Sequence, residues 1–210
     1  MMCGGTFSIL VVFSVISHCL KAVVLLVSED HDGSLLVVTD AGGFGVLIAD
    51  AVDNYKMSLA DFDPATVKKF RETFPPYYQC ANPMDLTGSA KTEDMLKAGH
   101  LALEDPNIDA VVFGLQPIAP GLADSDVMAK QIVEHFGPGK TQKPFVVVEW
   151  GGKYPDDRTI RTILKESGMA VYSGAEEALR VLSKLASYQE YLTARKSIHS
   201  EVRLRRRDDE

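Results

Sequence analysis

Residues 35–51, with the sequence LLVVTDAGGFGVLIADA, decide the fold of this chain. Residues 35–38 are a short run of branched apolar side chains, which predicts a buried β-strand. Glycines at positions 42, 43 and 45 follow directly and predict a tight turn. Over residues 44–55 apolar side chains recur at helical spacing, so a helix should follow the turn. A strand that passes through a glycine turn into a helix is typical of the first unit of an α/β sheet.

The same alternation continues along the chain. Asp63 followed by Pro64 predicts the start of a helix, and the pair Pro75–Pro76 predicts its end. Further strands are expected at 109–115, 143–150 and 169–173, a short edge strand at 55–59, and further helices from about Thr92 and at 124–136, 157–167 and 174–196. Short connections between alternating strands and helices imply a parallel sheet that is covered on both faces. We therefore expect a doubly wound, flavodoxin-like α/β sheet of about five strands.

This regular pattern covers residues 33–192 and predicts one domain there, between an apolar segment at 1–32 and a charged tail at 193–210. Residues 6–27 are apolar and long enough to cross a bilayer. His18 and Lys21 interrupt this run, however, and no basic region precedes it, as a signal peptide would require. Two interpretations stay open: a membrane anchor or signal, and a buried strand or helix that belongs to this domain or to a larger one.

The composition excludes some classes of partner. The formal net charge of −7 at pH 7 argues against duplex nucleic acid, because binding it needs clustered Lys and Arg side chains. Cys3, Cys19 and Cys80 lack metal-binding spacing and are odd in number, so the sequence implies neither a metal site nor a disulfide framework. We expect a cytoplasmic protein, with attachment to a membrane through residues 6–27 as the alternative.

The glycine turn is the first candidate site. Ala41, Gly42, Gly43 and Gly45 bring backbone N–H groups together where few side chains obstruct a ligand. The helix that follows directs its positive dipole end and its free amides to the same place, so an anion is the expected ligand. The alternative is a purely structural turn whose amides are hydrated.

Polar residues at the other loops extend this candidate site. The loop at 82–86 contributes Asn82, Pro83 and Asp85, and the loop after the strand at 109–115 contributes Gln116 and Pro117. Ligands of parallel sheets bind at the carboxyl ends of the strands, where these loops should meet. Asn82 and Asp85 could hold the glycine turn through its backbone amides or contact a substrate. None of these loops pairs a nucleophile with a base.

Common nucleotide-binding motifs do not fit the chain. The dinucleotide pattern G-x-G-x-x-G/A, started at Gly43, meets Ile48 where a small residue is required. The segment GPGKT at 137–141 resembles the end of a P-loop, but the first glycine of that motif falls on Glu134. A flavodoxin-like protein that binds a flavin or a nucleotide is therefore a lesser alternative, since it would rest on architecture alone.

Five segments resemble one known family in their order and spacing: VTDAGGFGVLIADA, NPMDLTGSA, LEDPNIDAVVFGLQPIAP, KPFVVVEWGG and GMAVYSGAEEALRVLSKLASYQEYL. They are similar to the ligase-CoA subdomain of NDP-forming acyl-CoA synthetases of the ADP-forming acetate–CoA ligase type. More distantly, they resemble the carboxyl-terminal domain of the succinyl-CoA synthetase β-subunit. The similarity covers about residues 33–192.

The resemblance implies a function. Such enzymes interconvert acyl-CoA, ADP or GDP and phosphate with acid, CoA and ATP or GTP, through an acyl phosphate and a phosphohistidine. By this resemblance the phosphate side of the site consists of Ala41, Gly42, Gly43 and Gly45. The side that holds a small carboxylic acid or acyl phosphate consists of Asn82, Pro83, Asp85, Gln116 and Pro117.

The chain also departs from the family pattern. Asp40 stands where relatives usually have Asn or Gly, and a carboxylate there would repel a phosphate dianion unless it is turned away or paired. No Ser-His-Thr-Gly-like segment supplies the catalytic histidine, and the CoA-binding and ATP-grasp domains are missing. The resemblance therefore implies no catalytic residue in this chain and no tightly bound cofactor. CoA, ATP or ADP and Mg²⁺ are expected only in the complete enzyme.

These departures define the expected partners and one alternative. In the leading interpretation the partners are a domain with the CoA site and the histidine loop, and an ATP-grasp domain or subunit. In the alternative the chain is a non-catalytic module that senses acyl-CoA in a protein acyltransferase-like system, since some such proteins carry a ligase-like region without the histidine.

Overall fold

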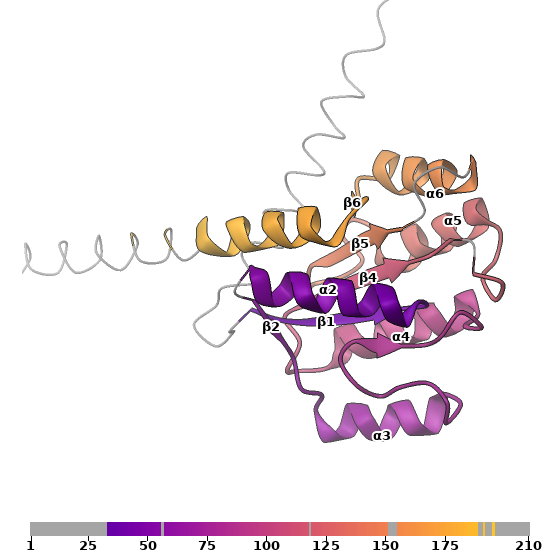
Figure 1. Cartoon of the computed structure of the whole chain (residues 1–210), viewed down its shortest axis with the longest axis horizontal. Helices are drawn as coiled ribbons and strands as arrows, with labels where there is room; N and C mark the ends of the chain where they lie inside the picture. The colour runs from indigo at the N-terminus through magenta and orange to yellow at the C-terminus, as the bar shows by residue number, and fades with distance from the viewer. Residues whose placement is uncertain are drawn as a thin grey trace, which may run out of the picture.

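A computed structural model describes residues 33–188 except 56, 118 and 151–154, together with residues 191 and 195. The expectations for residues 1–32 and 193–210, including the apolar run at 6–27, lie outside this part apart from residue 195. Figure 1 shows the described residues as a sheet with helices on both faces, which confirms the expected α/β class. Within the described residues, no helix is both long and apolar enough to cross a membrane.

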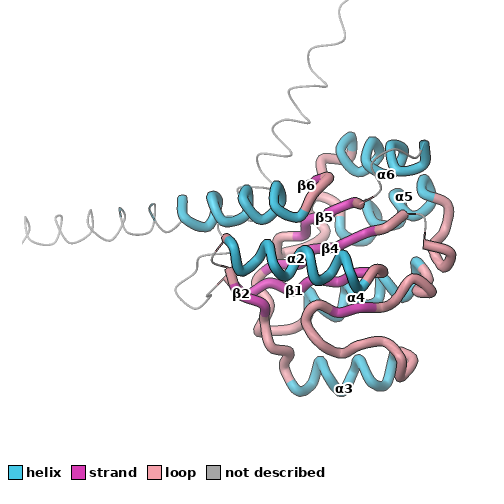
Figure 2. Tube along the Cα trace, in the orientation of Figure 1, coloured by secondary structure: helices cyan, strands magenta, loops and turns pink. Residues whose placement is uncertain are grey.

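The sheet has six strands, and every pairing in it is parallel. Figure 2 shows these strands in magenta between the cyan helices. The strands are β1 (Ser34–Thr39), β2 (Ser58–Leu59), β3 (Met84–Asp85), β4 (Ala110–Leu115), β5 (Phe145–Glu149) and β6 (Ala170–Tyr172). Their spatial order is β2-β1-β4-β5-β6, and β3 pairs with β1. This order is that of a flavodoxin-like doubly wound sheet, as the alternation of elements predicts.

Helices cover the two faces unequally. One face carries α2 (Gly42–Asn54) and the helical residues 175–188, and Figure 1 shows these two helices on the same side of the sheet. The other face carries α3 (Pro64–Thr73), α4 (Thr92–Glu104), α5 (Ser125–Phe136) and α6 (Pro155–Glu166). Every residue of β1, β4 and β5 is buried because both faces are covered, which explains their nearly continuous apolar sequences.

The helix boundaries follow local sequence signals. The side chain of Asp63 accepts a hydrogen bond from the amide of Ala65 at 2.8 Å, and Pro64 is the first residue of α3, as predicted. Helix α2 begins at Gly42, two residues before the position expected from its apolar stripe. The reason is that extended Ala41 serves as the N-cap residue, so two glycines without side chains belong to the first turn.

One strand was not expected from the sequence. The loop at 82–86 contains β3, which pairs with β1 through Val38 and Thr39, whereas β2 pairs with β1 through Ser34 and Leu35. Both short strands therefore lie along the same side of β1, one after the other. A two-residue strand has no apolar periodicity of its own, so the sequence pattern could not reveal it.

The side chain of Asn82 fills the gap between β2 and β3. Its Oδ1 accepts the amide hydrogen of Val37 at 3.1 Å, and its Nδ2 donates to the carbonyl oxygens of Leu35 at 2.7 Å and Ala60 at 3.0 Å. The first bond satisfies the amide of Val37, which has no residue of β2 or β3 opposite it, and the other two connect β1 to the end of β2. Asn82 therefore acts as a substitute for a strand residue at the edge of β1.

Candidate functional site

The amino end of α2 has two backbone amides without a partner among the described residues. The amide of Ala41 donates to Thr39 Oγ1 at 3.1 Å, and the amides of Phe44 and Gly45 donate to the Ala41 carbonyl at 2.9 and 3.0 Å. Among the residues that the structure describes, the amides of Gly42 and Gly43 have no hydrogen-bond partner. Of the four residues predicted to bind phosphate, only these two have amides free to donate to a ligand.

The space around the three glycines differs. A Cβ at Gly43 would meet nothing within 4 Å, and this residue is exposed. A Cβ at Gly42 would collide with the carboxylate of Asp85, and one at Gly45 would lie 3.0 Å from Thr39 Cγ2 and 3.2 Å from Pro83 Cβ. Gly43 therefore faces open space in front of the helix, whereas Gly42 and Gly45 allow the loop at 82–86 to pack closely.

This packing brings part of the predicted substrate side next to the predicted phosphate side. Pro83 lies against Gly45, and Asp85 lies against Gly42 while its Oδ1 accepts the Thr87 amide at 2.8 Å. Asn82 is directed into the sheet instead, and its three bonds there use its side-chain amide within the fold. Its contacts therefore do not support the substrate contact predicted for it. Pro83 and Asp85 remain at the site.

Asp40 connects the ends of β1 and β4. Its side chain is fully buried, and its Oδ1 accepts the backbone amide of Gln116 at 2.9 Å. The pKa of Asp40 is raised to about 7, mainly by burial. Hydrogen bonds from the backbone amides of Gln116 and of Asp40 itself act to lower this pKa, and the charge of Asp85 acts to raise it. The carboxyl group is thus turned toward the end of β4.

The hydrogen bond between Asp40 and Gln116 lies where β1 and β4 end and the chain continues onto opposite faces of the sheet. After β1 the chain enters α2 on one face, and after β4 it leads to α5 on the other face. In an open parallel sheet, a crevice forms at such a switch point and ligands bind in it. Gln116 is half-buried at this place and Pro117 is buried, and the Gln116 carbonyl accepts the Ala119 amide at 2.9 Å.

Comparison with known proteins shows the family of this chain. The family model of the ligase-CoA domain matches residues 35–196, which include every described strand except the first residue of β1. The chain belongs to the ligase-CoA domain family. The resemblance that the sequence motifs indicate is therefore confirmed, and so is the flavodoxin-like fold.

Curated relatives of this ligase-CoA domain are ADP-forming acid–CoA ligases. Acetate–CoA ligase [ADP-forming] I of Archaeoglobus fulgidus is 32% identical over 164 residues, which cover 78% of this chain and 22% of the relative. The α subunit of acetate–CoA ligase [ADP-forming] II of Pyrococcus furiosus is 29% identical over 142 residues, 67% of this chain and 30% of the relative. The 4-hydroxybutyrate–CoA ligase [ADP-forming] of Nitrosopumilus maritimus is 27% identical over 161 residues, 77% of this chain and 22% of the relative.

A solved structure shows the same fold. The dinucleotide-forming acetyl-coenzyme A synthetase 1 of Ca. Korarchaeum cryptofilum, in complex with phosphate and ADP, superposes with a TM-score of 0.66. The two sequences are 26% identical, and the superposition covers 77% of this chain and 35% of that chain. The ligase-CoA domain described here thus spans about a third or less of the proteins it matches.

Two further contacts border the switch point, and the sequence analysis assigned no role to either. The ring of Phe44, in the first turn of α2, stacks on Trp150 after β5 with centroids 5.3 Å apart and planes at 21°. Buried Glu149 at the end of β5 forms an ion pair with Arg161 of α6, with 2.6 Å between Oε2 and Nε. Of these four residues, all but Arg161 lie in a quoted motif, but spacing alone does not predict either contact.

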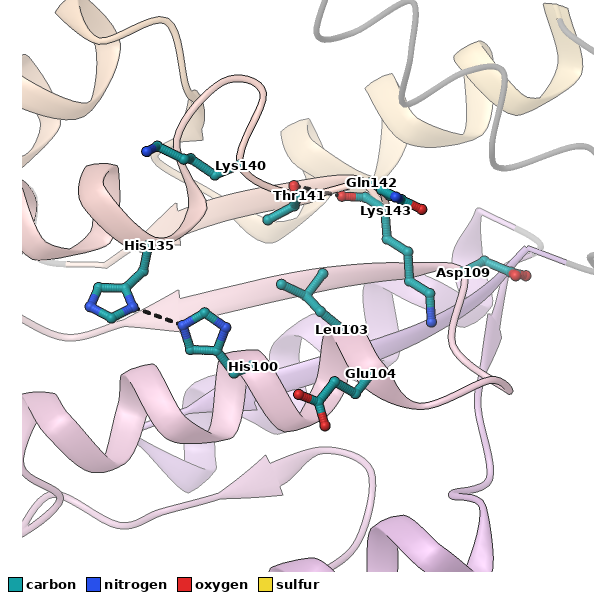
Figure 3. Close-up of a pocket in the computed structure, with 9 residues that line it drawn as sticks. All are labelled: His100, Leu103, Glu104, Asp109, His135, Lys140, Thr141, Gln142 and Lys143. Carbon is teal, nitrogen blue, oxygen red and sulfur yellow. Dashed lines mark hydrogen bonds between the residues drawn. The ribbon is translucent and has the colours of Figure 1, made fainter.

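A cleft of about 440 Å³ lies away from this site (Figure 3). It is lined in part by His100, His135, Asp109 and Lys143; the last two precede β4 and β5, so the cleft lies toward the amino ends of these strands. His100 Nε2 and His135 Nδ1 are 2.7 Å apart and joined by a hydrogen bond, which links α4 to α5. In the part of the chain that the structure describes, no group of three or more His, Cys, Asp or Glu side chains is placed to hold a metal ion.

Proposed function

We propose that this ligase-CoA domain is a module of an NDP-forming acid–CoA ligase, in which the amino end of α2 receives the phosphoryl group. The complete enzyme would interconvert acyl-CoA, ADP or GDP and phosphate with acid, CoA and ATP or GTP through a phosphohistidine. The names of the relatives support this class of reaction, since each is an ADP-forming ligase of an acid and CoA.

One observation carries the proposal. The free amides of Gly42 and Gly43 lie at the amino end of a 13-residue helix, next to the switch point of a parallel sheet. Hydrogen-bond donors and a helix dipole that are already oriented stabilise a phosphoryl group without reorganisation, which is the main contribution that a protein makes to phosphoryl transfer. The open space at Gly43 leaves room for a group brought by another polypeptide segment.

The neighbouring residues have distinct parts in this proposal. Pro83 and Asp85 close the side of the site next to Gly42 and Gly45, and Gln116 and Pro117 form its border beyond β4. These four residues would face the small carboxylic acid or acyl phosphate. Ala41 would position the two donating amides by accepting the bonds of Phe44 and Gly45, without binding the phosphoryl group itself.

Partner domains would supply the remaining chemistry. One would carry CoA and the phosphorylated histidine, and an ATP-grasp domain or subunit would bind ATP or ADP with Mg²⁺. Two relatives from Pyrococcus furiosus are named as α subunits, which supports an enzyme divided between chains. We expect such an enzyme to act in the cytoplasm, because these nucleotides and CoA occur there.

Titration of the full chain with inorganic phosphate tests the site. In ¹⁵N-edited NMR spectra, the amide signals of Gly42 and Gly43 should shift most, because these amides would donate to the anion. Gly43→Val places a side chain in the open space and should abolish the shifts while the fold persists. Gly174→Val is the matched control: Gly174 lies directly before the helical residues 175–188, and a Cβ there also meets nothing within 4 Å. Shifts that survive Gly43→Val would refute the assignment of the site.

Reconstitution tests the enzyme. When the histidine-loop and ATP-grasp domains are supplied, the complex should release ADP in a reaction that depends on acid, CoA and ATP. Gly43→Val should prevent accumulation of phosphohistidine in that complex, and Gly174→Val should not. Binding of acyl-CoA by the isolated chain, with no activity after reconstitution, would instead support the regulatory module.

A further inference from the structure

We propose that Asp40 is a specificity-determining residue of the anion site, such that a doubly charged oxyanion binds at Gly42 and Gly43 only together with a proton on Asp40. This inference rests on the proposed function, because it concerns the same site. It adds a property that the motifs of the family do not contain, namely a carboxyl group whose charge state decides whether the anion is accepted.

The position of Asp40 places its charge near any such anion. The residue directly precedes Ala41, the N-cap residue of α2, so only one residue separates it from Gly42. Its side chain is fully buried, and Oδ1 is held by the Gln116 amide at 2.9 Å. Oδ2 is buried as well and has no hydrogen-bond partner from another residue in the described part of the chain. Burial at this place means that little solvent screens the charge.

The charged groups around Asp40 do not compensate a negative charge there. Asp85 lies against Gly42 and adds a second carboxylate on the other side of the helix terminus. The first turn of α2 contains no acidic residue, and its residues Gly42 to Gly45 include no basic side chain. Glu149, at the end of β5 beyond β4, is ion-paired with Arg161, so this cation is already engaged. An ionised Asp40 would therefore oppose a dianion with only the helix amides to offset it.

Protonation removes this conflict. Burial of the carboxyl group raises its pKa to about 7, so it changes charge near neutral pH. A dianion at Gly42 and Gly43 would raise this pKa further, because the ionised form would then face an additional negative charge. By linkage, the anion and the proton must favour each other's binding equally. Anion affinity should therefore fall as the pH rises through about 7.

Sulfate is a suitable probe, because its charge stays constant over the pH range in which phosphate itself titrates. We would titrate the full chain with sodium sulfate at constant ionic strength and follow the amide signals of Gly42 and Gly43 by NMR at pH 6 and 8.5. For the wild-type chain, the apparent dissociation constant should rise about tenfold or more between these pH values. For Asp40→Asn it should change by less than about twofold, because Asn keeps the acceptor for Gln116 but never carries charge.

Asp85→Asn is the matched control, since it removes the neighbouring carboxylate and leaves Asp40 in place. It should strengthen sulfate binding at both pH values and preserve the pH dependence. Equal affinity of the wild-type chain at both pH values, or a pH dependence that disappears in Asp85→Asn and persists in Asp40→Asn, would overturn the inference. If sulfate shifts neither glycine at any pH in any variant, the proposed function fails; pH-independent binding at these glycines refutes only the role of Asp40.

Discussion

The carboxylate of Asp85 lies directly against the Cα of Gly42, at the place where a Cβ on residue 42 would be. The same carboxylate accepts the Thr87 amide at 2.8 Å, so it cannot move aside without losing that bond. Gly43, the next residue, has open space in the corresponding direction. Two adjacent glycines of one helical turn therefore have different structural requirements.

This difference predicts opposite effects of two alanine substitutions. Gly42→Ala should lower the free energy of unfolding by about 1–3 kcal/mol, because the new methyl group displaces Asp85 from its bond. Gly43→Ala should leave it unchanged or raise it by up to about 1 kcal/mol, because alanine favours the helix and meets no neighbour. Urea unfolding of both variants measures the difference. Equal effects of the two substitutions would contradict the packing of Asp85 on Gly42.

Asn82 is predicted to stabilise the sheet. Asn82→Ala removes three hydrogen bonds and leaves groups of Val37, Leu35 and Ala60 with fewer partners, so the free energy of unfolding should fall by about 2–4 kcal/mol. Asn107→Ala is the control, because the exposed side chain of Asn107 donates one bond, to the carbonyl of Asp61, and its loss should cost less than about 1 kcal/mol. A loss for Asn82→Ala as small as that of the control would show that the side chain does not hold β1.

Asp40 is predicted to make stability depend on pH. Its pKa rises from 3.8 to about 7 on folding, so the folded state binds the proton more tightly than the unfolded state. Its contribution is therefore fully present below about pH 4 and is lost as the pH rises to about 7. Compared with wild type, Asp40→Asn should gain about 1–2 kcal/mol in relative stability between pH 5.5 and 8. Denaturant unfolding at both pH values measures this gain, and a constant difference would argue against a proton on Asp40.

The order of strands and helices could be predicted from the sequence because each element carries its own apolar pattern. The strand at 35–38, the helix start at Asp63 and the edge strand near 55–59 are confirmed on this basis. The role of Asn82 could not be predicted, since it depends on a gap between β2 and β3 that exists only after both have paired with β1.

The candidate site, like the fold, could be predicted from the sequence only in part. The glycine turn was identified from its composition, but which amides remain free depends on the Ala41 carbonyl, whose bonds from Phe44 and Gly45 are set by the helix geometry. The direction of the Asp40 side chain depends on the amide of Gln116, which lies 76 residues later in the chain, directly after β4. Contacts between residues so distant in sequence leave no periodic signal, so the sequence identified the residues of the site but not their partners.

The ion pair between Glu149 and Arg161 is predicted to stabilise the fold mainly because Arg161 compensates the buried charge of Glu149. Glu149 is fully buried, whereas the Arg161 side chain is 26% exposed. Arg161→Met removes the cation and leaves a buried carboxylate without it, so the free energy of unfolding should fall by about 3–5 kcal/mol. Thermal or denaturant unfolding measures this loss.

The double variant Glu149→Gln/Arg161→Met separates the effect of the buried charge of Glu149 from the loss of packing by Arg161. Because Gln carries no charge at this position, the double variant should recover about half or more of the stability lost by Arg161→Met alone. Lys69→Met is a control for the removal of a surface cation: Lys69 pairs with Glu104 at 3.0 Å with both side chains exposed, and its loss should cost at most about 1 kcal/mol. If the double variant were less stable than Arg161→Met, the carboxylate of Glu149 would stabilise the fold even without Arg161. The ion pair would then not be what holds α6 at the end of β5.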